Sequence, residues 1–150
     1  MKYRTLGRTG LEVSEIAFGG GFVGGLLIHQ DDATKRAAVA RALAAGVNWI
    51  DTAPMYGDGQ SEEALGWLLK EVEAEPHVST KIMLDTAHLD DIEGQIEESL
   101  RESFSRLKRD SVTLMQLHNP IEAEAAGHAV GVADVLRRGG VADTLDRLEQ

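Results

Sequence analysis

The sequence predicts a parallel α/β fold of the (β/α)8 TIM-barrel type, preceded by a β-hairpin. Short apolar segments alternate with longer amphipathic segments at intervals of about 30 residues, a pattern typical of parallel strands joined by helical crossovers. Ionisable residues follow several apolar segments, where the carboxyl ends of parallel strands would gather them at one mouth of a barrel. The 150 residues suffice for about four of the eight units of a barrel, so residues 1–150 predict one incomplete barrel domain.

The N-terminal residues predict a hairpin and then a strand. Runs at 3–6 and 11–13 flank the sequence Gly7-Arg8-Thr9-Gly10, and a connection that contains glycine favours a turn between paired strands. Residues 15–18 predict the first buried strand of the barrel, which three successive glycines end.

The first helix is predicted from its two ends. Asp31 and Asp32 can accept hydrogen bonds from its first turn, and Gly46 suits the position just past its last turn. A strand at 47–51 follows it. The helix face that packs on the core is predicted to consist of Ala33, Ala37, Ala40, Leu43 and Ala44.

The second helix is predicted to begin at a Ser61 cap. Glu62 and Glu63 then lie in its first turn, where carboxylates favour the positive end of the helix dipole. A strand at 77–82 follows Pro76. The inner stripe of this helix is predicted to be Leu65, Leu68, Leu69 and Val72.

The third helix has the clearest period in the chain, because apolar residues recur at helical spacing from 92 to 107. A strand at 112–117, a mixture of loop and short helix at 119–140 and a helix at 141–148 complete the pattern. Core packing is further predicted for the large side chains Trp49, Met55, Trp67, Met83 and Phe104.

Composition excludes several classes of function. The net charge of −10 argues against a nucleic-acid-binding protein, and no apolar run is long enough to cross a bilayer. The chain has no cysteine, its first 15 residues lack the apolar region of a secretory signal, and its histidines show no zinc-ligand spacing. We therefore expect a cytoplasmic enzyme without a metal site.

A second α/β architecture competes with the barrel. Gly19, Gly21 and Gly24 satisfy the G-x-G-x-x-G pattern of doubly wound dinucleotide-binding sheets. In that fingerprint the glycines open a helix directly, whereas residues 25–30 intervene here before the first helix cap. A long loop also follows Asp51, where the doubly wound fold has a short turn. The barrel is therefore the favoured architecture.

Four proton-handling residues follow or end successive predicted strands: Asp51, Tyr56, Lys81 and His118. Taken singly, each is an ordinary acid, aromatic, amine or imidazole of a protein surface or strand end. Their joint placement at the carboxyl ends of parallel strands predicts a catalytic site.

Four segments carry a family resemblance: YRTLGRTGLEVS, AGVNWIDTAPMYGDGQSEEALGWLL, VSTK and SLRESFSRLKRDSVTLMQLH. Together they resemble the opening hairpin and the signature motifs of the aldo-keto reductase family along nearly the whole chain. The resemblance implies that Asp51, Tyr56, Lys81 and His118 correspond to the catalytic tetrad of that family. One departure is Thr113, where the family usually has an aspartate.

The chemistry of the four residues agrees with a carbonyl reductase. Hydride transfer to a carbonyl leaves charge on its oxygen, so a proton donor is needed there, and Tyr56 is the candidate. A free phenol titrates near pH 10, and the ammonium of Lys81, held in place by Asp51, would favour the phenolate. His118 would either orient the carbonyl as a neutral donor or share in proton transfer to Tyr56.

The resemblance also implies a nicotinamide cofactor, with NADPH favoured and NADH as the alternative, and a small carbonyl substrate. Gly20, Gly21, Phe22 and Asp51 would contact the nicotinamide side of the cofactor, while the absent half of the barrel would normally supply most of its binding pocket. The chain is accordingly expected to be a reductase fragment, to close a barrel by self-association of two half-barrels, or to be a noncatalytic interaction module. A lyase or aldolase with a Schiff base on Lys81 is a further alternative.

Overall fold

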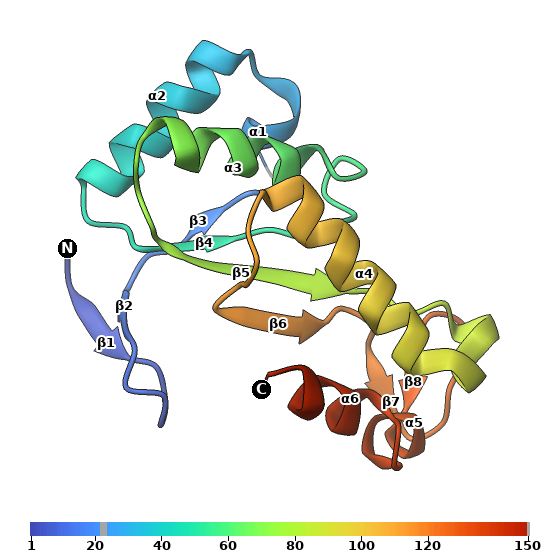
Figure 1. Ribbon diagram of the computed structural model, residues 1–150. Coiled ribbons are helices and arrows are strands. Elements are labelled where there is room, and N and C mark those ends of the chain that lie inside the picture. The colour runs from blue at the N-terminus through green and yellow to red at the C-terminus, as the bar shows by residue number, and fades with distance from the viewer. Residues whose placement is uncertain (22–23, 150) are drawn as a thin grey trace. The chain divides into compact units, whose positions relative to one another are not determined.

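The computed structural model describes residues 1–21 and 24–149 (Figure 1). The chain forms two compact units. Unit 1 comprises Met1–Thr80 and Ser103–Met115, and unit 2 comprises Lys81–Glu102 and Gln116–Gln150. The boundaries between the units fall within two strands and one helix. None of the helices in the described part of the chain is both long enough and apolar enough to cross a membrane.

The predicted hairpin is confirmed in unit 1. Strands β1 (Tyr3–Thr5) and β2 (Glu12–Ser14) pair antiparallel, with Tyr3 opposite Ser14. The hydroxyl of Tyr3 donates to the carbonyl of Gly46 at 2.9 Å, and the side-chain oxygen of Asn48 accepts from the amide of Ser14 at 2.7 Å. These two contacts attach the hairpin to the chain just before the second strand of the sheet.

The alternation of strands and helices is also confirmed. Strands β3 (Phe18–Gly19), β4 (Trp49–Asp51), β5 (His77–Ile82) and β6 (Leu114–Leu117) form one sheet in that order. The β3–β4 and β4–β5 pairs are parallel.

Three predicted strand starts are wrong. Strand β6, predicted from 112, begins at Leu114. The other two errors have identifiable reasons. The strand predicted at 15–18 begins only at Phe18, and residues 15–17 are exposed, because the amide of Glu15 extends the hairpin by donating to the carbonyl of Lys2 at 3.0 Å. Strand β4 begins two residues later than predicted. The amide of Val47 instead donates to the carbonyl of Ala42 and closes the preceding helix, while Gly46 takes the left-handed conformation with φ of 89°.

Three helices belong to unit 1: the short α1 (Leu26–His29), which was not predicted, α2 (Asp32–Ala44) and α3 (Gln60–Glu71). Asp31 caps α2 as expected, since its carboxylate accepts from the amide of Thr34 at 3.0 Å, and this hydrogen bond lowers the pKa of Asp31. The predicted inner face of α2 is partly wrong. Val39 is fully buried, whereas Ala33, Ala37 and Ala44 are exposed.

The core of unit 1 lies between α3 and the sheet. Leu65, Leu68 and Leu69 of α3 are buried as predicted, and burial of each leucine side chain contributes about 1.5–3 kcal/mol. Trp67 is partly buried and packs against this core. The guanidinium carbon of Arg36 lies 5.2 Å from the centroid of the Trp67 ring. The other buried members of the core are Leu27, Val39, Ile50, Ala64, Val78 and Leu107.

Helix α4 (Ile92–Leu107) follows the predicted period: Ile92, Ile96 and Leu107 are buried, and Leu100 and Phe104 are half-buried. The prediction that Met55 and Met83 pack in the core is wrong, since their side chains are 49% and 41% exposed. Met83 directly follows β5, and Met55 lies in the connection between β4 and α3.

Unit 2 contains the 3-10 helix η1 (Thr86–Asp91), strands β7 (Ile121–Glu122) and β8 (Val130–Gly131), and helices α5 (Val132–Leu136) and α6 (Val141–Leu148). The parallel β7–β8 pair was not predicted. In η1 the Nδ1 atom of His88 lies 2.9 Å from the carboxylate of Asp85, and this contact raises the pKa of His88. The helix predicted at 141–148 is confirmed.

Close contact between α3 and the end of α4 predicts the effect of a single methyl group. A Cβ at Gly66 would collide with the main-chain carbonyl of Arg106. Replacement of a helical glycine by alanine normally stabilises by about 1 kcal/mol, but overpacking against backbone costs more, so we expect Gly66→Ala to lower the free energy of unfolding by about 2 kcal/mol. Urea unfolding measures this change. Lys70→Ala, at an exposed position of the same helix, should change it by less than about 0.5 kcal/mol.

Candidate active site

Asp51 ends β4, and the pleat of the strand decides which way it faces. Trp49 and Asp51 lie two residues apart on the strand and therefore share one face of the sheet. Ser79 lies opposite Asp51 on β5. Its hydroxyl donates to Oδ1 of Asp51 at 2.8 Å and accepts from Nε1 of Trp49 at 3.1 Å. Asp51 is thus oriented by a serine that the sequence did not indicate.

Thr52 and Thr80 face the opposite way, toward α3. The hydroxyl of Thr52 lies 2.8 Å from the hydroxyl of Ser61, and both residues are fully buried. The hydroxyl of Thr80 donates to Oε1 of Glu62 at 2.6 Å. Each of these threonines is adjacent in sequence to a predicted catalytic residue. The first turn of α3 therefore holds the ends of β4 and β5.

Tyr56 lies in the connection between β4 and α3. Gly57, Asp58 and Gly59 have φ values of 66°, 53° and 86°, three successive left-handed residues that glycine and aspartate tolerate better than most. The amide of Gly59 donates to the carbonyl of Pro54 at 2.7 Å, and that of Ser61 donates to the carbonyl of Tyr56 at 3.2 Å. The backbone that carries Tyr56 is fixed by these bonds.

Gly20 and Gly21 pack beside Asp51 and Tyr56. The amide of Gly20 donates to the carbonyl of Asp51 at 2.7 Å, and a Cβ at this position would lie 2.5 Å from the hydroxyl of Ser61. A Cβ at Gly21 would lie 3.2 Å from the ring of Tyr56. Unit 1 thus brings together Gly20, Gly21, Asp51 and Tyr56. Phe22, predicted to contact the cofactor, lies outside the described residues.

Lys81 and His118 belong to unit 2, at the ends of β5 and β6. Lys81 is 9% exposed, and the amide of His118 donates to the carbonyl of Ile82 at 2.7 Å. The next residue, Asn119, accepts from the amide of Leu84 at 2.7 Å and donates to its carbonyl at 3.0 Å. The predicted tetrad is therefore divided between the units, Asp51 and Tyr56 in one and Lys81 and His118 in the other.

Glu62 and Glu63 lie in the first turn of α3 as predicted, but in opposite environments. Glu63 is exposed. Glu62 is fully buried, and its Oε2 accepts from Nε of Arg106 at 2.7 Å. The predicted Ser61 cap is wrong, because the N-cap position is occupied by Gly59.

Thr113, the position that departs from the family pattern, supports the start of β5. Its hydroxyl accepts from the amide of Val78 at 3.3 Å and lies 3.4 Å from Nδ1 of His77. Both of these contacts are made to the first two residues of β5.

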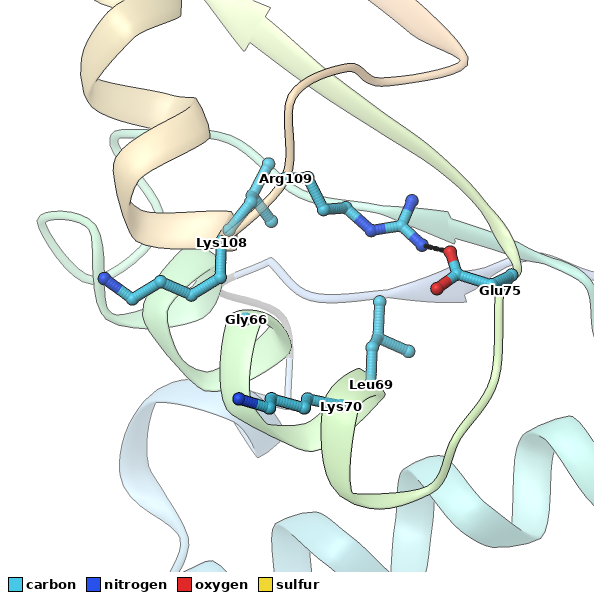
Figure 2. A pocket seen from close by; sticks show the side chains of 7 residues that line it. Gly66, Leu69, Lys70, Glu75, Lys108 and Arg109 are labelled. Carbon is cyan, nitrogen blue, oxygen red and sulfur yellow. Dashed lines mark hydrogen bonds and ion pairs between the residues drawn. The ribbon is translucent and has the colours of Figure 1, made fainter.

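A hollow of about 180 Å³ lies elsewhere in unit 1, between α3 and the end of α4 (Figure 2). The guanidinium of Arg109 is bound to the carboxylate of Glu75, and the side chains of Lys70 and Lys108 extend away from that ion pair (Figure 2). None of the predicted site residues lines this hollow. The candidate active site is therefore the group of strand-end residues, and the hollow is separate from it.

Comparison with known proteins gives a consistent result. A model described as "Aldo/keto reductase family" matches residues 15–150. The chain is 35% identical over 127 residues to aldo-keto reductase YhdN of Bacillus subtilis, and 34% identical over 124 residues to L-galactose dehydrogenase of Arabidopsis thaliana. These alignments cover 80% and 79% of this chain. The chain spans 38% of the length of each of these two relatives.

Solved structures show the same likeness. The holo form of aldo-keto reductase AKR11C1 from Bacillus halodurans superposes with a TM-score of 0.65 at 30% identity, over 79% of this chain and 40% of the other. The expected partial (β/α)8 barrel is thereby confirmed, and the doubly wound alternative is not needed.

The contact between Gly21 and Tyr56 predicts a position-specific effect of a methyl group. Gly21→Ala should displace the ring of Tyr56, because the added Cβ would lie closer to it than side chains normally approach. Gly19→Ala should not, since a Cβ at Gly19 has no atom within 4 Å. The chain has two tyrosines, so NMR of tyrosine-labelled protein gives one ring to follow and Tyr3 as an internal reference. An unmoved Tyr56 signal in Gly21→Ala would contradict the described packing.

Proposed function

The chain belongs to the aldo/keto reductase family, and from this membership we propose that it supplies the acid–base residues of a reductase that converts aldehydes or ketones to alcohols. The observation that carries the proposal is the convergence of Asp51, Tyr56, Gly20 and Gly21 within unit 1. An acid and a phenol lie beside two residues without side chains, at the end of parallel strands. Such strand ends are where barrel enzymes place their active residues.

Tyr56 is proposed as the proton donor to the carbonyl oxygen. A phenol is a weak acid, so it needs a neighbour that stabilises its anion while the proton moves. Lys81 would supply that positive charge, and Asp51 would keep Lys81 charged and oriented. Ser79 supports this assignment, because it holds one carboxylate oxygen of Asp51 at 2.8 Å and so restricts how the side chain can turn.

His118 is proposed to act on the same oxygen. As a neutral imidazole it would donate a hydrogen bond to the carbonyl and orient it, or it would share in proton transfer to Tyr56. Either role requires that His118 be held in place, and hydrogen bonds hold the backbone at this position. Its amide is bound to Ile82, and the adjacent Asn119 binds both main-chain polar groups of Leu84. The backbone on which His118 stands is thereby fixed to β5.

The residues near Tyr56 fit the planar end of a nicotinamide cofactor. Gly20 and Gly21 present bare backbone there, and a Cβ at either position would meet a neighbouring atom. We propose that Gly20, Gly21, Phe22 and Asp51 contact this part of the cofactor, with NADPH favoured over NADH. The bound reduced nicotinamide would supply the hydride to the carbonyl carbon. Because the chain spans 38% of the length of the two relatives named above, a second copy of the chain is a proposed source of further contacts.

The role of Tyr56 can be tested by removal of its hydroxyl. Tyr56→Phe should lower kcat for reduction of a simple aldehyde by about 10²- to 10⁴-fold, the range typical of a lost general acid. NADPH binding, measured by fluorescence titration alongside the mass in solution, should be unchanged. Tyr3→Phe, at the other tyrosine of the chain, is the matched control and should retain turnover. Full turnover by Tyr56→Phe would remove Tyr56 from the mechanism.

One alternative has an observation in its favour. A lysine that is 9% exposed at a strand end suits a Schiff-base nucleophile as well as an electrostatic role, so a lyase or aldolase must be separated from a reductase. Borohydride treatment in the presence of an aldehyde, followed by peptide mass analysis, should leave no preferential adduct on Lys81. An adduct on Lys81 that exceeds those on exposed lysines such as Lys70 would favour the alternative. NADPH binding without any turnover would instead favour a noncatalytic module.

A further inference from the structure

We propose that Glu62 is a positioning residue for Tyr56 and Lys81, acting through Arg106 and Thr80 without touching the substrate. The inference rests on the proposed function and extends it to a residue outside the tetrad. Glu62 is fully buried, and isolated burial of a carboxylate is so unfavourable that such groups occur only with partners. Here both oxygens are engaged, one by Thr80 at 2.6 Å and the other by Arg106 at 2.7 Å.

The contact with Thr80 fixes the end of β5. Successive side chains of a strand point to opposite faces, so the hydrogen bond that turns Thr80 toward α3 turns Lys81 to the other face. Ser79 shares that other face and binds Asp51. Loss of the Thr80–Glu62 bond would therefore free the strand end to twist. Rotation there changes the direction of Lys81 directly, because the two residues share a peptide bond.

The contact with Arg106 supports the turn that carries Tyr56. The Cδ of Arg106 lies close under Gly59, where an added Cβ would come within 2.8 Å of it. Gly59 is the N-cap of α3, and its amide donates to the carbonyl of Pro54. The side chain of Arg106 therefore packs against the turn formed by residues 54–59. The carboxylate of Glu62 holds that side chain in place. Charge-assisted hydrogen bonds of this kind are short and directional, which suits them to fix a geometry.

Stability alone does not account for this arrangement. Buried ion pairs often contribute no more to folding than apolar residues of the same size, because removal of both charges from water offsets their attraction. The hydroxyls of Ser61 and Thr52 form a second contact of the same kind. Ser61 binds Thr52, next to Asp51, just as Glu62 binds Thr80, next to Lys81. Adjacent residues in the first turn of α3 thus hold the residues next to two tetrad members.

The test follows Tyr56 itself. In a Tyr3→Phe background the one remaining tyrosine is Tyr56, and its ring signals can be followed by NMR of tyrosine-labelled protein. Glu62→Gln keeps the size of the side chain but cannot form the ion pair with Arg106, so the support under the turn that carries Tyr56 weakens and the ring signals of Tyr56 should move. The fall in kcat/KM should be about 10- to 100-fold with NADPH binding unchanged. Glu63→Gln, at the exposed neighbour, should alter neither quantity.

Thr80 variants keep the inference falsifiable if Glu62→Gln fails to fold. Thr80→Val removes the hydroxyl and leaves the Glu62–Arg106 pair intact, so it should lower kcat/KM by a smaller factor, and Thr80→Ser should restore the wild-type kcat/KM. A folded Thr80→Val or Glu62→Gln chain with the wild-type Tyr56 signals and turnover would overturn the positioning role and leave the proposed function standing. A wild-type chain that binds NADPH without any turnover would overturn the proposed function and this inference with it.

Discussion

The alternation of side chains at the ends of β4 and β5 is the constraint on which the rest of the site depends. Asp51 and Lys81 each stand next to a threonine that bonds to the first turn of α3. Because neighbouring residues of a strand face opposite sides, the helix that anchors the threonines also determines the direction of the ionisable residues. The fold thus orients the predicted catalytic side chains through hydrogen bonds made by their neighbours in sequence. A purely apolar contact would resist rotation less, since it lacks the directionality of a hydrogen bond.

Local patterns explain which elements were predictable. The hairpin, β5, α4 and α6 carry strong turn signals or clear periods, and all were predicted within one or two residues. Errors occurred where the signal was weak or tertiary contacts competed. In α2 the alanines outnumber Val39, yet the larger side chain is the one buried. Glu15 was predicted to begin the first strand of the barrel. Its amide instead donates to the carbonyl of Lys2, and its carboxylate accepts from Arg4, so it belongs to the hairpin.

The candidate site shows a similar division. Asp51, Tyr56, Lys81 and His118 stand out in the sequence because ionisable residues at strand ends are conspicuous. Ser79 and Asn119 do not, although each lies within two residues of a tetrad member. Glu62 could not have been found locally, since its partners are 18 and 44 residues away along the chain. Its neighbour Glu63 has the same chemistry and the opposite environment, and the sequence contains no signal that separates them.

The hydrogen bond from Trp49 to Ser79 has an optical consequence. Indole emission is sensitive to nearby charge and hydrogen bonding, and this indole donates to the same hydroxyl that donates to Asp51. A change in the charge of the Asp51 carboxylate would alter its hydrogen bond with Ser79. That change would in turn alter the hydrogen bond from Trp49 to Ser79 and the emission of the Trp49 indole. The second tryptophan, Trp67, lies on α3, where the guanidinium of Arg36 stacks over its ring. The protein therefore carries its own fluorescent reporter of the acid in its candidate site, without any added label.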